Sequence, residues 1–333
     1  MASLAIALRL PLLLFRKPRN HKHNRKSSHS KDSDDQDRES HERPRLCNYH
    51  ELPEWYRHQE SPYIVTNYRP PSNSYHSCIH SLTYLHNETM NVWTHLLPAI
   101  TLALALPLLQ INISRIYADA PWMDRFMLTL TPMAALLTFS LSSTYHTLNN
   151  HSALVSSSCL LMDFAGILVL ILCSFISGIY VGFYGYPFER KLYWTMIALL
   201  TLTSTLLVLH PRLQGPKFRP HRTSAFVLTV LSGLAPTFHG MYVHGIRKGF
   251  HECGVKWWLL EGICYGIGVL FFTSRFPERW GWSETGGDGM WFRRARFDVF
   301  GGSHQVFHIC VVLGAACHCW GVWSAWGFAV RGS

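Results

Sequence analysis

Charged side chains are scarce in this chain of 333 residues. Asp, Glu, Lys and Arg make up 15% of it, whereas hydrophobic residues make up 48%. Soluble domains usually carry about 25% charged residues. Between Phe126 and Phe188 the only formal charge is Asp163. This composition excludes a soluble enzyme, a coiled coil and a collagen, and it indicates a chain that is solvated by lipid.

Three common signatures are also missing. The nine cysteines have no regular spacing and most lie inside apolar runs, which excludes a disulfide framework. No helix motif with Glu between two histidines occurs, so the familiar zinc-protease class has no support. No period of 20–50 residues recurs between the apolar runs, which excludes a repeat solenoid.

The formal net charge of +10 invites a nucleic-acid interpretation. The basic residues, however, lie in an N-terminal tail and in short loops between apolar runs, so we expect anionic lipid headgroups and no nucleic acid as partners. Residues 16–45 hold ten Lys or Arg and six Asp or Glu, and we predict that they are disordered. Residues 1–15 are apolar but too short to span a bilayer, which suits a peripheral or removable end.

Seven apolar runs follow the tail and predict an all-α integral membrane protein, a multi-pass seven-transmembrane helix bundle. Basic loop residues are almost balanced between the two sides, so the basic tail decides the orientation. We expect a cytoplasmic N-terminus, in the plasma membrane or an endomembrane. The predicted spans are 92–113, 126–148, 156–183, 192–209, 223–244, 257–274 and 305–328. The predicted segments are an apolar start with a basic tail (1–46), a juxtamembrane amphipathic segment (47–91), the transmembrane domain (92–328) and a short C-terminal tail (329–333).

Polar residues inside the predicted spans gather on one side of the membrane. Because successive spans alternate in direction, the second span ends on the side where the third and seventh begin. Ser142 and His146 lie near that end, and Asp163 lies one or two turns into the third span. His304 and His308 lie at the start of the seventh. Polar residues in lipid are costly and mark functional sites, so we predict that these five converge.

Three neutral imidazoles from two helices suit Zn²⁺, because a catalytic zinc site takes three protein ligands and keeps a fourth position for water. We therefore predict His146, His304 and His308 as metal ligands. An open zinc site lowers the pKa of its water towards ~7 and supplies a nucleophile. Asp163 would be the general base or an orienting acceptor, and Ser142 would hold the water or an oxyanion. The competing interpretation is that a histidine pair at a helix start only anchors the helix at the interface.

Other polar residues have a structural interpretation. One face of the first span carries Glu88, Asn91 and His95. One interpretation is a stripe of polar residues that hydrogen-bond to one another, and the other is a ligand or catalytic role. His318 lies towards the opposite side, as a buried donor or acceptor. Glu261 is a lone acid in the sixth span, for which we expect a packed, paired role.

Seven motifs resemble those of the progestin and adipoQ receptor family, also called the adiponectin-receptor or haemolysin III-related family. The resemblance covers roughly residues 50–325. It implies a seven-helix membrane protein with a cytoplasmic N-terminus and a zinc ion near the cytoplasmic face. The zinc histidines then fall on His146, His304 and His308, with Ser142 and Asp163 beside the metal-bound water. The motifs are ELPEW (51–55), YIVTNYRP (63–70), LHNETMNVWTHLL (85–97), SSTYHTL (142–148), MDFAGI (162–167), FPER (276–279) and GGSHQVFH (301–308).

The chain departs from the family pattern at three places. Asn150 stands where many members have Cys, and Phe164 replaces a frequent Tyr. The stretch 280–299 is longer than the usual link into the last helix, which bears on any gating or partner contact there.

Two function classes follow. The first is a zinc-dependent hydrolase that cleaves the amide of a ceramide-like lipid. The second is a receptor or regulator with structural zinc, in lipid or sterol signalling or zinc homeostasis, whose ligand is a sterol-related lipid, a steroid or an extracellular protein. A zinc transporter is the weaker alternative, since transport needs polar groups staged across the bilayer.

Overall fold

The computed structural model describes residues 45–281 and 297–332, which belong to one compact unit, residues 44–333. The predicted tail and most of the 280–299 link therefore lie outside the described residues. Among the described residues there are helices and one isolated bridge, between Cys47 and Tyr68, but no strand. The predicted all-α fold is confirmed.

Seven helical segments of the described chain are long and apolar enough to cross a membrane, as predicted. Each predicted run falls on one of them, and the observed helices extend a few residues beyond most of the runs. They are α5 (Thr89–Ile116), α6 (Trp122–Leu148), α7 (Ala153–Gly182), α8 (Pro187–Val208), the pair α9 (Arg219–Leu231) and α10 (Leu234–His244), α12 (Val255–Ser274) and α14 (Ser303–Gly332).

The fifth span is broken, although the sequence predicts one helix over 223–244. α9 ends at Leu231 and α10 begins at Leu234. A Cβ at Gly233 would lie only 2.9 Å from the Phe175 ring on α7, so a larger residue at the break would require that ring to move. Pro236 follows in the first turn of α10, where its missing N–H removes no helical hydrogen bond.

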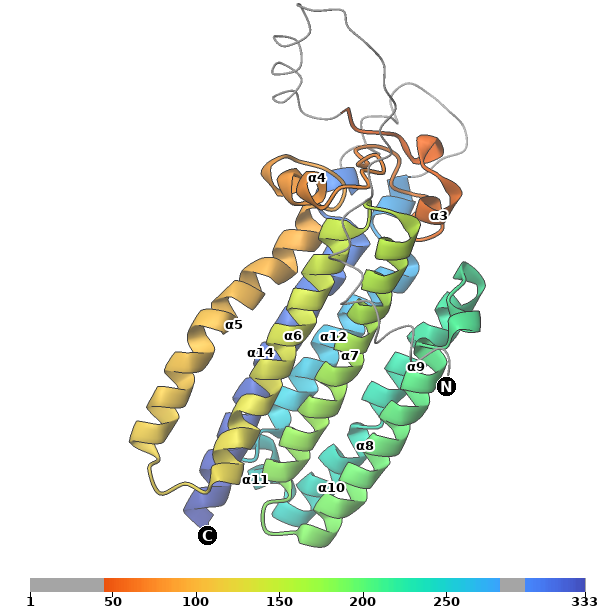
Figure 1. Ribbon diagram of the computed structural model, residues 1–333. Coiled ribbons are helices and arrows are strands. Elements are labelled where there is room, and N and C mark those ends of the chain that lie inside the picture. Colours follow the sequence, from red (N-terminus) through yellow and green to blue (C-terminus); the bar gives the residue numbers. More distant parts are fainter. Residues whose placement is uncertain (1–44, 282–296, 333) are drawn as a thin grey trace, which may run out of the picture. The chain divides into compact units, whose positions relative to one another are not determined.

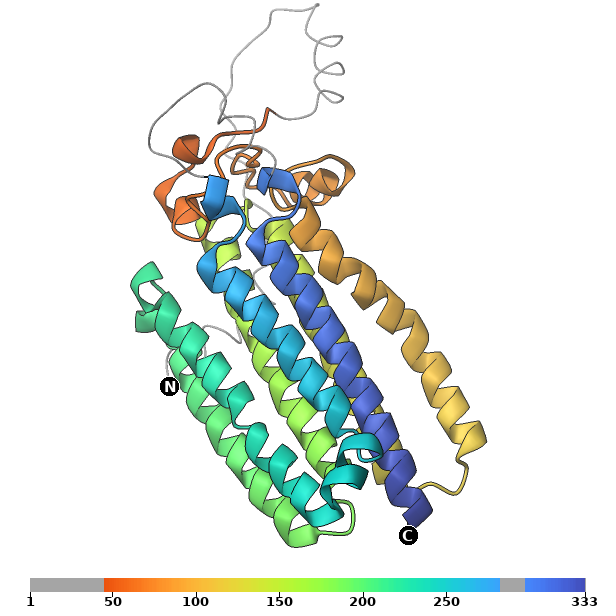
Figure 2. The same cartoon turned by 180° about the vertical axis from the view of Figure 1, so that it is seen from behind.

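The helices of the bundle are arranged around α14, which contacts α5, α6, α7 and α12. α8, α9 and α10 lie along one side of α7, whereas α5 packs on α6 (Figures 1 and 2). α12 and α14 pack closely because glycines of α14 face rings of α12. A Cβ at Gly314 would overlap the Tyr265 ring, and one at Gly321 would overlap the Trp258 indole.

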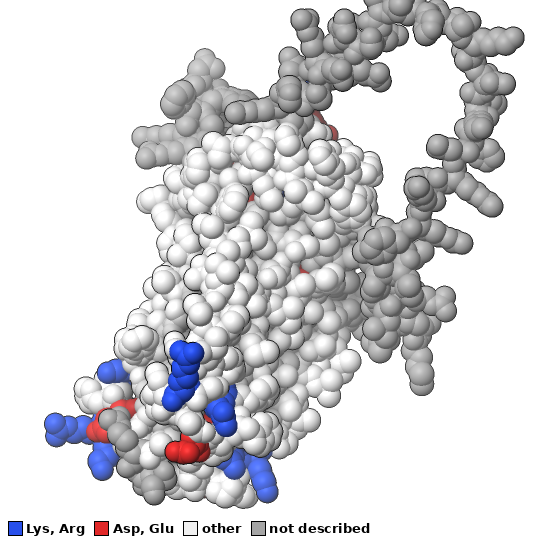
Figure 3. Space-filling view, turned by 60° about the vertical axis from the view of Figure 1, so that its left-hand side comes forward, with Lys and Arg blue, Asp and Glu red and all other residues white. Residues whose placement is uncertain are grey.

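The outer surface of the bundle matches a lipid environment. In Figure 3 the Lys and Arg side chains gather at one end, and the middle of the visible face carries none. Large apolar side chains face outward instead, among them Leu104 on α5 and Leu206 on α8. Lipid tails cannot solvate a charge, so this distribution is the one that a spanning bundle requires.

Residues 45–88, here called the cap layer, cover one end of the bundle (Figure 1). The cap layer contains the short helices α3 (Glu54–Arg57) and α4 (Tyr75–His80). Its own small core is formed by Leu52, Tyr56 and Tyr68. The cap layer lies over the end at which α6 finishes and α7 and α14 begin, which is where the predicted site residues lie.

Candidate metal centre

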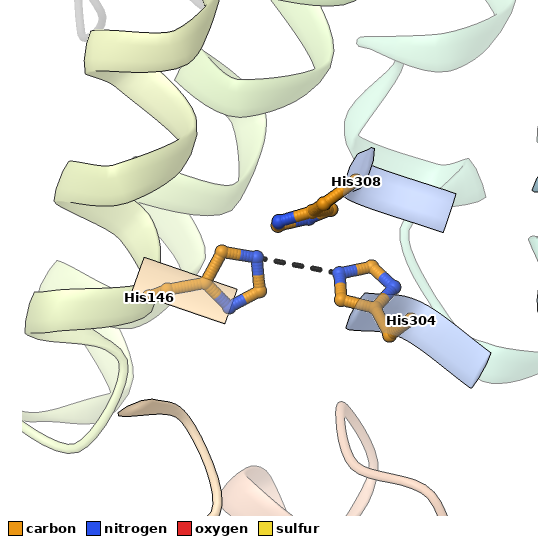
Figure 4. A group of neighbouring side chains, drawn as sticks. All are labelled: His146, His304 and His308. Atoms are coloured by element: carbon orange, nitrogen blue, oxygen red, sulfur yellow. Dashed lines mark hydrogen bonds between the residues drawn. The ribbon is translucent and has the colours of Figure 1, made fainter. Parts of the chain in front are cut away.

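Three histidines from two helices meet beneath the cap layer. His146, His304 and His308 each offer a ring nitrogen, and these atoms lie within 4.8 Å of one another. The Nε2 atoms of His146 and His304 are 3.3 Å apart, and Figure 4 shows the three rings around a common centre. The structure thus brings together the three imidazoles that the sequence singles out, in an arrangement that could hold a metal ion.

Helix position explains this meeting. His146 lies in the last turn of α6, and His304 is the second residue of α14. α14 packs against α6, so the end of one helix faces the start of the other. His308 is one turn beyond His304 and therefore lies on the same helix face.

Two charged residues fix the helix ends that carry the histidines. The fully buried Arg69 guanidinium donates to the carbonyls of His146 (2.7 Å) and Thr147 (3.0 Å), which have no helical partner at the end of α6. Glu278 accepts from the amide (2.8 Å) and hydroxyl (2.5 Å) of Ser303 at the start of α14. A cation at a helix C-terminus and an anion at an N-terminus both stabilise the helix. Sequence reasoning did not assign either residue to the site, although both lie in the quoted motifs.

The outer nitrogens of two histidines have defined partners. His146 Nδ1 donates to Glu88 Oε2 at 2.6 Å. His308 Nδ1 donates to the Asn91 carbonyl at 3.1 Å and lies 3.2 Å from Thr94 Oγ1. Because carboxylate and carbonyl oxygens only accept, both Nδ1 atoms carry the proton. With the proton on Nδ1, Nε2 is the ring nitrogen of each histidine that can bind a metal.

The polar stripe at the start of α5, formed by Glu88, Asn91 and His95, supports these histidines. The prediction that its residues satisfy one another is therefore correct only in part. Glu88 does accept from Asn91 Nδ2, at 2.8 Å, but its closest partner is His146. His95 stacks on the ring of His308, with centroids 3.8 Å apart, and neither of its ring nitrogens has a hydrogen-bond partner among the described residues. Glu88 and Asn91 therefore orient His146 and His308, and the His95 ring covers one face of His308.

The cap layer adds a buried neutral imidazole. His86 is inaccessible to solvent, and its Nδ1 accepts the backbone N–H of Glu88 at 3.1 Å. Burial, reinforced by the positive charge of Arg69, lowers the pKa of His86 to about 3. An unprotonated Nδ1 is what this hydrogen bond requires, so His86 helps to shape the turn that presents Glu88 to the site.

The remaining predicted residues, Ser142 and Asp163, line a cavity of about 990 Å³ together with the three histidines. Ser142 lies one turn before His146 on α6. α7 begins at Ala153, earlier than predicted, so Asp163 lies nearly three turns into it rather than one or two. Asp163 is not part of the group of potential ligand atoms. It lies beside the histidine cluster, and its chemical role stays a prediction.

The comparisons with known proteins agree on one family. Residues 83–319 match the Haemolysin-III related family. The chain is 32% identical to the ADIPOR-like receptor IZH2 of Saccharomyces cerevisiae over 278 residues, 82% of each chain. It is 30% identical to the Adiponectin receptor protein of Drosophila melanogaster over 279 residues, 84% of this chain and 59% of that protein. Heptahelical transmembrane protein 3 of Arabidopsis thaliana is 27% identical, over 83% of this chain and 86% of that protein.

Proposed function

Because the chain belongs to the haemolysin-III-related family of adiponectin-receptor-like, multi-pass membrane proteins, we propose that it is a zinc-dependent hydrolase of lipid amides. The substrate is a ceramide-like lipid, which is cleaved to a fatty acid and a sphingoid base. The observation that carries this proposal is the group of three imidazoles on the wall of the cavity, with a carboxylate and a hydroxyl beside it.

The donor set fits zinc. Imidazole nitrogens suit this ion, and three protein ligands with an open fourth position are typical of catalytic sites. The hydrogen bonds from His146 to Glu88 and from His308 to the Asn91 carbonyl are of the kind that orients zinc ligands and fixes their tautomers. When bound, zinc would polarise a carbonyl group and make water a stronger nucleophile.

The chain's own residues supply the proton transfers. The Asp163 carboxylate accepts a proton from water as the water oxygen attacks the amide carbon, and it returns that proton to nitrogen as the C–N bond breaks. The Ser142 hydroxyl donates a hydrogen bond to the carbonyl oxygen, on which negative charge develops. The apolar part of the cavity wall, such as Leu160 and Ile167, accommodates the acyl chain and excludes bulk water.

We place the N-terminus and the metal centre on the cytoplasmic side, in the plasma membrane or an endomembrane. The ten basic residues of 16–45 support this orientation, since positively charged segments stay on the cytoplasmic side. The lipid substrate would reach the cavity from within the bilayer.

A second candidate is a receptor or regulator in which zinc is structural. The yeast and fly relatives are named as receptors, which favours this candidate. A metal held by His146 and by His304 and His308 would then tie α6 to α14, and an extracellular protein, a steroid or a sterol-related lipid would shift the helices. The two functions are compatible, because a ligand could regulate a hydrolase.

The test is metal content and ceramide turnover of detergent-purified protein, wild type against Asp163→Asn. We expect one equivalent of zinc in both, with turnover about 10²–10⁴-fold lower in the variant. Asp119→Asn, in the exposed α5–α6 connection, is the matched control and should keep full turnover. Zinc without turnover in any of the proteins would favour the receptor. No zinc at all would overturn both functions.

A further inference from the structure

A second polar cluster lies on the wall of the same cavity, deep in the bundle. Glu261 on α12 accepts from His318 Nδ1 on α14 at 2.8 Å, and the two side chains are 13% and 6% exposed. This confirms the packed, paired role expected for Glu261 and the buried donor or acceptor role expected for His318. His318 Nε2 lies 3.4 Å from Ser177 Oγ on α7, and Ser174 lies one turn before Ser177. Three helices therefore contribute to the cluster.

The cluster is well separated from the metal centre. His318 lies ten residues beyond His308 on α14, which is about 15 Å of helix. Ser174 lies eleven residues beyond Asp163 on α7, a similar distance. Two helices thus place the cluster at the same depth, and the cavity wall includes residues of both levels.

One hydroxyl of the cluster has no partner. Ser174 is 5% exposed and lies on the cavity wall, and its Oγ makes no hydrogen bond within the described residues. Burying a hydroxyl without a partner is unfavourable, so a group inside the cavity is the natural partner. Glu261 also has acceptor capacity left, because a carboxylate can accept about four hydrogen bonds.

We propose that Ser174, Glu261 and His318 form a recognition site for a hydroxyl group on the distal part of an elongated amphipathic lipid whose polar head lies at the histidine cluster. A hydroxyl donates to Glu261 and accepts from Ser174 Oγ, which satisfies both. An anionic group would be repelled by the Glu261 carboxylate, and a plain alkyl chain would leave Ser174 unpartnered. The site therefore selects a hydroxylated chain over an unsubstituted chain of the same length. Only the position of the head group rests on the proposed function.

The test is a binding measurement with two matched probes, tritiated 12-hydroxydodecanoate and dodecanoate, on the full-length protein in lipid nanodiscs. Empty nanodiscs give the background. We expect the wild type to bind the hydroxylated probe about tenfold more tightly, the effect of one or two buried hydrogen bonds. Ser174→Ala and Glu261→Gln should each reduce this preference to less than about threefold.

Ser174→Ala keeps the test decisive even if Glu261→Gln fails to fold, because it removes no observed hydrogen bond. Thr201→Val is the matched control: its Oγ1 is also buried without a partner among the described residues, but it lies on α8, away from the cavity wall, and the preference should survive. Equal binding of both probes by the wild type, or a preference unchanged in Ser174→Ala, would overturn the proposal.

The result of this binding measurement does not depend on whether the protein hydrolyses ceramide. A hydroxyl preference without ceramide hydrolysis would leave the recognition site in place and remove the proposed hydrolase. Hydrolysis without a hydroxyl preference would retain the hydrolase and remove the recognition site.

Discussion

Asp124 and Glu88 are both buried carboxylates, and they lie at opposite ends of α6. Asp124, near the start of that helix, accepts from the hydroxyls of Tyr180 (2.5 Å) and Tyr184 (3.1 Å) and from the indole of Trp326 (2.8 Å). Glu88, in the cap layer beside the other end, accepts from an imidazole and from asparagine side-chain amides.

The donors explain what each acid does. Tyr180 and Trp326 belong to an apolar core cluster, and Asp124 is absent from the cavity wall. Its hydrogen bonds therefore hold α6, α7 and α14 together. Glu88 lies on the cavity wall, and its partner His146 presents the opposite nitrogen to two further imidazoles. Both carboxylates are buried, so burial alone does not distinguish their roles. The difference lies in the donors: those of Asp124 pack in the core, whereas the donor to Glu88 is an imidazole of the histidine cluster.

The largest expected effect comes from removing two of the three imidazoles. In His304→Ala combined with His308→Ala, zinc should fall from one equivalent to less than about a tenth, because a single histidine cannot hold the ion. The bundle should also lose thermal stability, since a bound metal stabilises the folded state. Inductively coupled plasma mass spectrometry of purified protein gives the zinc content. A folded double variant that still holds one equivalent would show that the metal centre lies elsewhere.

Replacing each of the two acids by its amide tests the comparison between them. Glu88→Gln should weaken zinc binding about 10–100-fold, because it removes the charge that orients His146 and raises its basicity. Competition with a chromophoric chelator measures this affinity. Asp124→Asn is the mirror variant: it should keep the affinity and lower the free energy of unfolding by about 1–3 kcal/mol. If both variants lost metal to the same extent, the distinction between the two ends of the bundle would fail.

A smaller effect concerns acid sensitivity at the cap layer. The pKa of His86 is about 3 in the folded protein, against an ordinary value near 6.5. Between these values the unfolded chain binds more protons, so stability is lost as the pH falls below about 6.5. At pH 5 the loss is about 2 kcal/mol, because each pKa unit is worth about 1.4 kcal/mol.

His86→Asn should remove this loss while its side-chain oxygen still accepts the Glu88 N–H. Thermal unfolding in detergent at pH 7.5 and pH 5 measures the difference. Identical pH dependence in wild type and variant would contradict a neutral buried His86.

Much of the site was predictable because it follows from helix length and direction. Apolar runs define the spans, and their alternation places the end of α6 next to the start of α14. The 304/308 spacing then puts two imidazoles on one face, so the meeting with His146 requires no knowledge of side-chain contacts. The depth of Asp163 in α7 was predicted less accurately, because it depends on where α7 begins.

The supports of the site could not be predicted in the same way. Arg69 lies far from α6 in the sequence, and only the folded cap layer brings it to the carbonyl of His146. Glu278 precedes α14 by more than twenty residues and caps it through Ser303. Hydrogen bonds of this kind leave no periodicity in the sequence, since each depends on one close approach between distant segments.

The sequence by itself determined that the chain spans a membrane seven times and that three histidines lie at one end of the bundle. Burial in lipid requires long apolar helices, and helix geometry orders their side chains, so both features are local. Tertiary structure alone decided that the fifth span breaks at Gly233 and that Glu88 orients His146 while Asp124 joins core residues. It also decided that Ser177, one turn after Ser174, lies beside the Glu261–His318 pair. These outcomes depend on packing between helices, whose contacts join residues that are remote in the chain.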